Sequence, residues 1–358
     1  MAIDADTLQM LEASTEVPEL DLSFLNLDES NVYGVRPKPG RKGLTLSEIE
    51  IGPWGSAPDH STNHTLRLRG VRPRVGAQRL GYTIRDKSEV WSENALLLYE
   101  EAVQRQWSSA TDIPWQELRP LPDDIERAVC QFCTFLTEVE FIAGDTPGQW
   151  LPVISGDYYE IGLFLMSQIM DEARHMDVFR KRALANGGGL LQQGNGSGLR
   201  ILLDAKDFTE MSVLMHVLAE GFVQSLFRMG ELIGPTEVEK RIMRMAAQDE
   251  SRHLAFGVMH LKYVIDTAPE RREEIHHYLD REEDLFNRPD SRNAGLNESL
   301  LVLLGGGRDK LDQGFEKLLA IQKKQVNEYI HRLDVAGLGD RRERVHPAWK
   351  PFIEPARA

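Results

Sequence analysis

The fold of this chain is decided by two related stretches, Asp171-Glu172-Ala173-Arg174-His175 and Asp249-Glu250-Ser251-Arg252-His253. Both read Asp-Glu-x-Arg-His, and both lie within long stretches of helical periodicity. A Glu and a His three positions apart share one face of a helix, one turn from each other, so both side chains can bind the same metal ion. Two such pairs on different helices, each helped by one further Glu, are the ligand set of a dinuclear iron or manganese site in a four-helix bundle.

The two further glutamates are predicted from apolar stripes that each contain one acid. Before Glu250, Glu220 continues a stripe at helical spacing, made of Val213, Val217, Val223 and Phe227. Before Glu172, Glu140 lies on the apolar stripe of its segment, and Glu138, on the wetter side, is the alternative. Glu140 precedes Glu172 by 32 residues and Glu220 precedes Glu250 by 30, so each half predicts an antiparallel helix pair.

The expected metal ligands, which are also the expected catalytic residues, are Glu140, Glu172, His175, Glu220, Glu250 and His253. Four carboxylates neutralise two divalent ions, and neutral imidazoles complete each coordination sphere. We expect Asp171 and Asp249 to accept the outer N–H of a ligand histidine, with Arg174 and Arg252 holding those two carboxylates. His216, one turn before Glu220, is either a seventh ligand or, as we expect, a supporting or core histidine.

A simpler reading of the two motifs is a pair of solvated helix faces with local ion pairs. Two copies, each with a matched inward glutamate, argue against it. Four carboxylates buried without metal would have to be protonated or would strongly destabilise the fold, so the site is expected to be filled.

Composition restricts the class of protein. The chain has 358 residues, 41% of them hydrophobic, and a formal net charge of −14, which argues against binding to nucleic acid or an anionic membrane. No apolar run reaches the length of a membrane span, and the N-terminus lacks the features of a signal peptide. These features predict a cytoplasmic protein, compatible with a basic electron-transfer partner.

The pattern along the chain predicts an all-α fold. We expect an irregular N-terminal extension packed on the bundle (residues 1–87), a ferritin-like di-metal helical bundle (88–266), and additional helices and tail of the same domain (267–358). The helix that carries Glu140 is expected to end near Gly144. The Gly- and Gln-rich residues 186–198 provide the long crossover that such a bundle needs between its helix pairs.

A basic stretch interrupts the acidic chain within the N-terminal extension. Its arginines are Arg67, Arg69, Arg72, Arg74 and Arg79. They either pack on the acidic surface of the bundle or recognise an anionic or carrier-bound substrate.

With the six ligands in place, the chain resembles the ferritin-like di-iron carboxylate superfamily over about residues 88–266. Its members include ribonucleotide reductase small subunits, multicomponent monooxygenases, acyl-carrier-protein desaturases, ligand-binding oxidases and arylamine N-oxygenases. Two positions depart from individual members. Phe179 stands where small subunits usually keep a radical tyrosine, and Ala246 stands where arylamine N-oxygenases carry an extra ligand histidine.

The resemblance implies an O2-activating, non-haem di-iron oxygenase or oxidase. It would use two Fe ions, or Mn/Fe, with O2 as co-substrate and an external ferredoxin or reductase as electron donor. Hydroxylation, N-oxygenation, desaturation and oxidative cleavage of a small organic substrate all fit this chemistry. The alternatives are a Mn/Fe ligand-binding oxidase, a radical-generating small subunit and a non-catalytic metal-handling protein. A homodimer through an outer helix face is compatible with each.

Overall fold

The computed structural model describes residues 4–13, 22–25, 36–194, 196–287 and 295–354. The chain divides into two compact units, Met1–Ile51 and Gly52–Ala358. The described part of the first unit contains helix α1 (Ala5–Ala13), a 3-10 turn (Ser23–Leu25) and the short helix α2 (Leu46–Ile49). All predicted ligands lie in the second unit.

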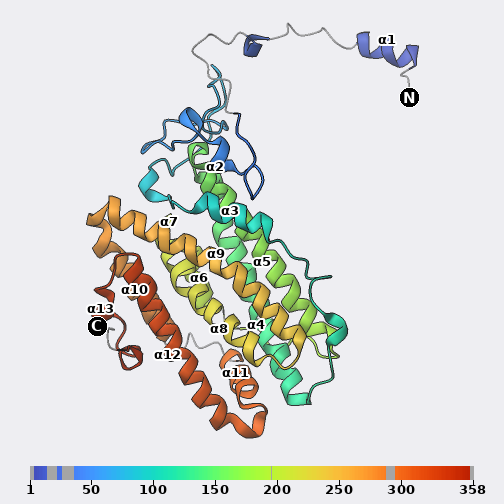
Figure 1. Cartoon of the computed structure of the whole chain (residues 1–358), viewed down its shortest axis with the longest axis vertical. Helices are drawn as coiled ribbons and strands as arrows, with labels where there is room; N and C mark the ends of the chain where they lie inside the picture. Colours follow the sequence, from blue (N-terminus) through green and yellow to red (C-terminus); the bar gives the residue numbers. More distant parts are fainter. Residues whose placement is uncertain (1–3, 14–21, 26–35, 195, 288–294, 355–358) are drawn as a thin grey trace. The chain divides into compact units, whose positions relative to one another are not determined.

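The second unit is built from helices (Figure 1). They are α3 (Ala95–Gln104), α4 (Asp123–Gly148), α5 (Tyr159–Ala185), α6 (Ser197–Leu203), α7 (Phe208–Ser212), α8 (Glu220–Ile233), α9 (Glu237–Thr267), α10 (Arg272–Asn287), α11 (Leu296–Gly305), α12 (Leu311–Val335) and α13 (Arg341–Arg344). Within the described residues, β-pairing is limited to isolated bridges such as His60 with Asp86. The predicted all-α class is confirmed.

Helices α4, α5, α8 and α9 form a four-helix bundle. Helix α4 packs along α5, α8 packs along α9, and α5 contacts α9, which joins the two pairs. The long connection between the pairs contains α6, and it is the crossover that distinguishes ferritin-like bundles. The predicted ferritin-like arrangement is therefore present.

Local sequence explains where these helices begin and end. Thr236 starts α9 with a capping box, in which its hydroxyl accepts the Val238 N–H at 3.1 Å and Glu239 caps the Thr236 N–H at 3.0 Å. The expected end of α4 near Gly144 is wrong, because the helix continues to Gly148. Pro147 lies in its last turn.

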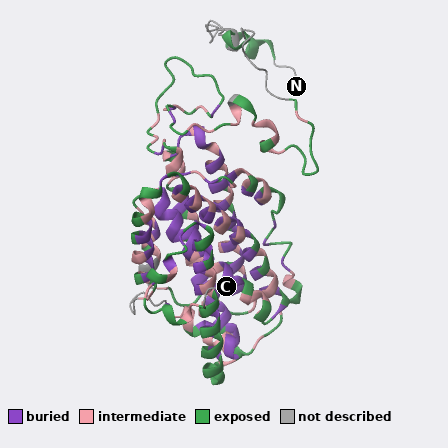
Figure 2. Cartoon of the chain, turned by 60° about the vertical axis from the view of Figure 1, so that its left-hand side comes forward, coloured by how far each residue is buried: buried purple, intermediate pink, exposed green. Residues whose placement is uncertain are grey.

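The C-terminal helices cover the bundle. Helix α12 packs against α8 and α9, and α11 packs against α4 and α12. Figure 2 shows the buried residues concentrated along the inner faces of the helices. The sequence did not predict α11, a ten-residue helix between glycines at 295 and 306.

Residues 52–94 are tied to the start of α5 by buried polar contacts. Arg69 pairs with Glu160 and donates to the Asp157 carbonyl at 2.6 Å and the Trp54 carbonyl at 2.9 Å. Tyr158 donates its hydroxyl hydrogen to the Arg85 carbonyl at 2.7 Å. Arg69 is therefore a structural ion-pair partner, in contrast to Arg72, Arg74 and Arg79 of the same stretch, which are exposed.

Among the described helices, none has an apolar stretch long enough to cross a lipid bilayer.

A π-helical segment, Val213–Ala219, connects α7 to α8 and ends next to Glu220. It packs closely on α9 at Gly257, where a Cβ atom would lie 2.3 Å from the His216 Cβ. Only the absence of a side chain at residue 257 allows this approach.

We predict that Gly257→Ala destabilises the protein by about 1–3 kcal/mol, because the added methyl group cannot fit without moving His216. Gly162→Ala is the matched control, since Gly162 also lies within a helix but has open space around its Cβ position. That control is expected to be neutral or slightly stabilising. Urea unfolding followed by circular dichroism measures both, and equal stabilities would contradict the tight contact.

Candidate metal centre

The six predicted ligands meet at the middle of the bundle and are all buried. Glu140 comes from α4, Glu172 and His175 from α5, Glu220 from the start of α8, and Glu250 and His253 from α9. Their potential ligand atoms form two groups, and within each group all atoms lie within 4.8 Å of one another. The groups are Glu140, Glu172, His175 and Glu250, and Glu172, Glu220, Glu250 and His253. Their role as metal ligands remains a prediction.

In the first group, His175 directs Nδ1 toward three carboxylates. Glu172 Oε2 lies at 3.2 Å, Glu250 Oε1 at 3.4 Å and Glu140 Oε2 at 3.6 Å. An ion placed among these atoms would have one imidazole and three carboxylate ligands.

The second group repeats this arrangement around His253. Its Nδ1 lies 3.2 Å from Glu172 Oε1, 3.3 Å from Glu250 Oε2 and 3.6 Å from Glu220 Oε1. Glu172 and Glu250 thus present one oxygen to each histidine, whereas Glu140 and Glu220 each serve one group. The arrangement predicts two bridging and two terminal carboxylates.

The outer face of each histidine bonds an aspartate from the opposite motif. His175 Nε2 lies 3.1 Å from Asp249 Oδ2, and His253 Nε2 lies 3.3 Å from Asp171 Oδ2. The carboxylate acceptors favour the tautomer that protonates Nε2 and leaves Nδ1 free to bind metal. The expected Asp–His contacts are present, and they cross between α5 and α9.

Two arginines link the aspartates to each other. Arg174 pairs with Asp171 and donates to Asp249 at 2.8 Å, while Arg252 donates to Asp171 at 2.7 Å and to Asp249 at 2.6 Å. Trp107 adds an indole N–H to Asp249 at 2.7 Å. These donors fix both carboxylates, and therefore both imidazoles, in orientation.

Burial and mutual charge shift the titration of the cluster. Burial raises the pKa of Glu140 and of Glu220 well above the ordinary carboxyl value. Burial lowers the pKa of His175 and His253, but the surrounding carboxylates outweigh it and hold both pKa values well above the usual histidine value. Glu172 shows the opposite balance: burial raises its pKa, yet the two histidines bring it below its ordinary value. Without ions, protons must balance the buried carboxylates.

The donor set fits two divalent ions. Four glutamates carry four negative charges, while the charges of the two aspartates and two arginines cancel. Three buried carboxylate oxygens, Glu140 Oε1, Glu172 Oε1 and Glu220 Oε2, lack a hydrogen-bond partner among the described residues. Metal coordination would satisfy such acceptors.

Gln168 joins His216 to the cluster, a role that the sequence analysis missed. It donates from Nε2 to Glu220 at 2.8 Å, and its Oε1 lies 3.1 Å from His216 Nε2. The Nδ1 atom of His216 lies 2.9 Å from the Ser212 hydroxyl. His216 therefore supports Glu220 through Gln168 and does not join either group of converging ligand atoms. Because the Gln168 side chain is uncharged, nothing in the sequence marked it as part of the site.

Glu138, the alternative ligand on α4, points elsewhere. Its Oε2 accepts the backbone N–H of Gly194 at 3.0 Å, in the connection that follows α5. The structure thus brings Glu140, and not Glu138, to the centre.

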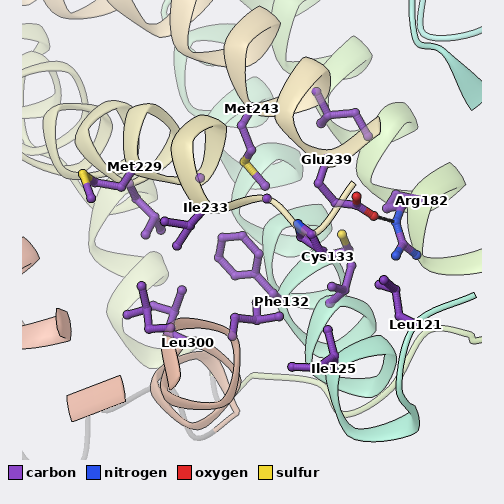
Figure 3. A pocket seen from close by; sticks show the side chains of 18 of the residues that line it. Leu121, Ile125, Phe132, Cys133, Arg182, Met229, Ile233, Glu239, Met243 and Leu300 are labelled. Atoms are coloured by element: carbon purple, nitrogen blue, oxygen red, sulfur yellow. Dashed lines mark hydrogen bonds and ion pairs between the residues drawn. The ribbon is translucent and has the colours of Figure 1, made fainter. Parts of the chain in front are cut away.

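An apolar cavity of about 330 Å³ lies among α4, α5, α8, α9 and α11 (Figure 3). Phe132, Met229, Ile233, Met243 and Leu300 line it. Phe179, one turn after the predicted ligand His175, also lines it and is fully buried. Along α5 the cavity therefore begins about one helical turn after His175.

The charged groups at the edge of this cavity already satisfy one another. Arg182 pairs with Glu239 and donates to Glu126 at 2.7 and 3.1 Å, and the Arg182–Glu239 contact is visible in Figure 3. Asn186 donates to Glu126 at 2.7 Å. With two carboxylates for one guanidinium, the wall offers no excess positive charge to an anion. The nearby Cys130 and Cys133 are buried free thiols that pack in the core.

Comparison with known proteins gave matches among solved structures only; no family model and no curated protein matches this chain. An R2-like ligand-binding oxidase variant with an aerobically reconstituted Mn/Fe cofactor is 16% identical with a TM-score of 0.47, over 68% of this chain and 94% of that chain. A second variant with the same cofactor is 17% identical with a TM-score of 0.45, over 74% and 98%. The form without metal cofactor is 16% identical with a TM-score of 0.43, over 69% and 95%. Because these scores are low, we base the fold on the helix pairing and the six converging side chains.

We predict that Glu140→Ala reduces bound metal from about two ions per chain to one or fewer, since one group loses its terminal carboxylate. Glu138→Ala, on the same helix, is the matched control and should keep the full complement. Metal content by mass spectrometry after anaerobic Fe(II) loading distinguishes the two variants. Equal metal content in both would remove Glu140 from the ligand set.

The raised pKa values predict how pH affects the metal-free protein. His175 and His253 stabilise the fold when protonated, so their contribution is present below pH 6.5 and is lost as the pH rises through their higher folded-state pKa values. The raised pKa values of Glu140 and Glu220 act in the same direction, because charging them in the folded state is unfavourable. We expect the unfolding temperature to fall from about pH 6 to about pH 9.

Loading with Fe(II) under anaerobic conditions should flatten this dependence, because ions replace the protons that balance the carboxylates. Thermal unfolding followed by circular dichroism measures both forms. A metal-free protein that gains stability over this pH range would contradict the charge balance described for the site.

Proposed function

We propose that this protein is a dinuclear non-haem metal oxidoreductase that activates O2 and oxidises a small, neutral, apolar organic molecule. The observation that carries the proposal is the convergence of four glutamates and two histidines in two linked groups, in a bundle that also holds an apolar cavity. Iron is the metal we expect at both positions, with Mn/Fe as the alternative.

The six side chains would hold the two ions, with Glu172 and Glu250 between them. Bound there, a redox-active metal pair would supply the electrons that reduce O2 and the oxidising power directed at the substrate. The aspartate and arginine contacts keep both imidazoles oriented while the charge of the centre changes. Phe164, stacked on Phe256 at 4.1 Å and edge-on to His253 at 6.4 Å, contributes to a dry surrounding.

The cavity supports the choice of substrate class. Its volume of about 330 Å³ is at the lower end of small-molecule sites, and most of its lining is aliphatic or aromatic. The satisfied Arg182 group gives no advantage to an anion. A neutral substrate is therefore favoured over the anionic or carrier-bound one suggested by the basic stretch of the sequence. An external reductase or ferredoxin would return electrons to the centre.

The absence of a tyrosine at residue 179 supports an oxidase or oxygenase over a radical-generating subunit. The buried phenylalanine at that position lies one turn from His175. A phenylalanine ring lacks the hydroxyl through which a tyrosine gives up an electron and a proton together. The other reading, a metal-handling protein, does not account for the apolar cavity.

We predict that the protein loaded anaerobically with Fe(II) consumes O2 when mixed with aerated buffer, whereas Glu172→Ala does not. The variant loses a carboxylate that faces both histidines. An oxygen electrode and the visible absorption spectrum follow the reaction, and far-ultraviolet circular dichroism checks that the variant remains helical. O2 uptake by Glu172→Ala at the wild-type rate would refute the proposed function.

Leu300→Trp is the matched variant for the cavity, because it fills the space from α11 without touching a predicted ligand. It should keep the O2 reaction of the metal centre and lose oxidation of an apolar substrate. Product analysis by mass spectrometry with a set of small hydrocarbons and arenes separates these effects.

A further inference from the structure

The two halves of the metal centre repeat each other but differ at the position one helical turn before each motif glutamate. Each half pairs a helix that carries a single glutamate with a helix that carries the Asp-Glu-x-Arg-His motif, α4 with α5 and α8 with α9. Gln168 stands four residues before Glu172, and Ala246 stands four residues before Glu250. Both side chains are fully buried, so one motif helix places an amide in the interior where the other places a methyl group.

The helices with the single glutamates differ in the same way. His216 stands four residues before Glu220, and Leu136 stands four residues before Glu140. These two side chains are also fully buried. One half of the centre thus holds a polar pair where the other half holds two aliphatic side chains.

Hydrogen bonds connect the polar pair to Glu220. Gln168 donates from Nε2 to Glu220 Oε1 at 2.8 Å, and its own Oε1 lies 3.1 Å from His216 Nε2. An ionised carboxylate can only accept, so the amide nitrogen faces Glu220 and the amide oxygen accepts from the imidazole. The Ser212 hydroxyl lies 2.9 Å from His216 Nδ1 and holds the ring from its other side. Gln168 therefore cannot turn its amide over without losing two hydrogen bonds.

Glu140 lacks comparable support. Its Oε2 lies 3.6 Å from His175 Nδ1, and its Oε1 has no hydrogen-bond partner among the described residues. Neither Ala246 nor Leu136, the counterparts of the polar pair, has a group that can donate a hydrogen bond. The Glu220 carboxylate is thus oriented before an ion binds, whereas the Glu140 carboxylate would be oriented by the ion itself.

We propose that Gln168 makes the two metal positions unequal, so that the position of His253 and Glu220 binds its ion more tightly and fills first. The inference rests on the metal centre of the proposed function. A carboxylate that is already held in place loses less freedom on binding, and removing such a supporting contact typically lowers metal affinity about 10- to 100-fold. Gln168 acts through Glu220 and is therefore a positioning residue. The ion at the position of His175 and Glu140 is the weaker and more readily exchanged one.

Variants that keep one complete position measure each affinity separately. Glu140→Ala retains the whole group around His253, and Glu220→Ala retains the whole group around His175. The metal-free, full-length variants are titrated with Mn(II) under anaerobic conditions and followed by isothermal titration calorimetry. We expect the dissociation constant of Glu140→Ala to be at least about tenfold lower than that of Glu220→Ala.

Double variants test whether Gln168 causes the difference. Adding Gln168→Leu to Glu140→Ala should weaken Mn(II) binding about tenfold or more, because the remaining position loses its support. Adding it to Glu220→Ala should leave the affinity unchanged, because the acceptor of the Gln168 amide is already absent. This second background is the matched control, since a general loss of structure would weaken both variants.

Three results would each overturn the proposal: equal affinities of the two single variants, no effect of Gln168→Leu in Glu140→Ala, or an equal loss in both backgrounds. If the wild type binds about two ions per chain, such a result removes the inequality and leaves the metal centre intact. A wild type that binds no ion overturns both. If Gln168→Leu is unfolded by circular dichroism, Gln168→Met, which is unbranched like glutamine, takes its place in the same comparison.

Discussion

The crossed contacts between aspartates and histidines are the constraint on which the rest of this structure depends. Asp249 of α9 holds His175 of α5, and Asp171 of α5 holds His253 of α9. Each helix therefore orients the imidazole of the other, and the two arginines connect both aspartates into one buried network. Because every member is bonded to the opposite helix, α5 and α9 cannot slide or rotate independently without breaking several charged hydrogen bonds.

This network also determines which features lie around the centre. The network of aspartates and arginines lies on the Nε2 side of the two histidines. The Nδ1 atoms therefore face the four glutamates on the opposite side. The apolar residues that follow along the bundle, beginning with Phe179, line the cavity. A polar interior core and an apolar cavity can be adjacent here because the charges of the network are satisfied among themselves.

Much of this arrangement follows from sequence. The repeated Asp-Glu-x-Arg-His motifs and single acids in apolar stripes predicted the bundle and all six residues that converge, because helical periodicity determines which side chains share a face. Glu140 was preferred to Glu138 because Glu140 lies on the apolar face of its helix. Periodicity describes single helices, however, and it gave no sign that each aspartate would bond the histidine of the other motif.

Features that depend on contacts between distant segments were not predictable in this way. Gln168 has no charge to mark it, and Arg69 was grouped with exposed arginines because its partner, Glu160, is 91 residues away. The place of the Arg332 guanidinium depends on Gly221, which lies on another helix. In each case the role of the residue depends on which residue lies next to it in space. A single sequence does not show which distant residues become neighbours.

The π-helical turn before Glu220 has a consequence for how this chain can change. A π-helix accommodates one residue more per turn than an α-helix, so Val213–Ala219 acts as an inserted residue within an otherwise regular rod. The wide turn takes up that residue locally, so the helix on either side keeps the register of an uninterrupted α-helix. Losing one residue here would therefore change which way the residues of the wide turn itself point, His216 among them, and would leave the flanking helices in place. Insertion or deletion of one residue in this segment should thus be better tolerated than the same change in the middle of α5 or α9, where it would rotate the rest of the helix by about 100°.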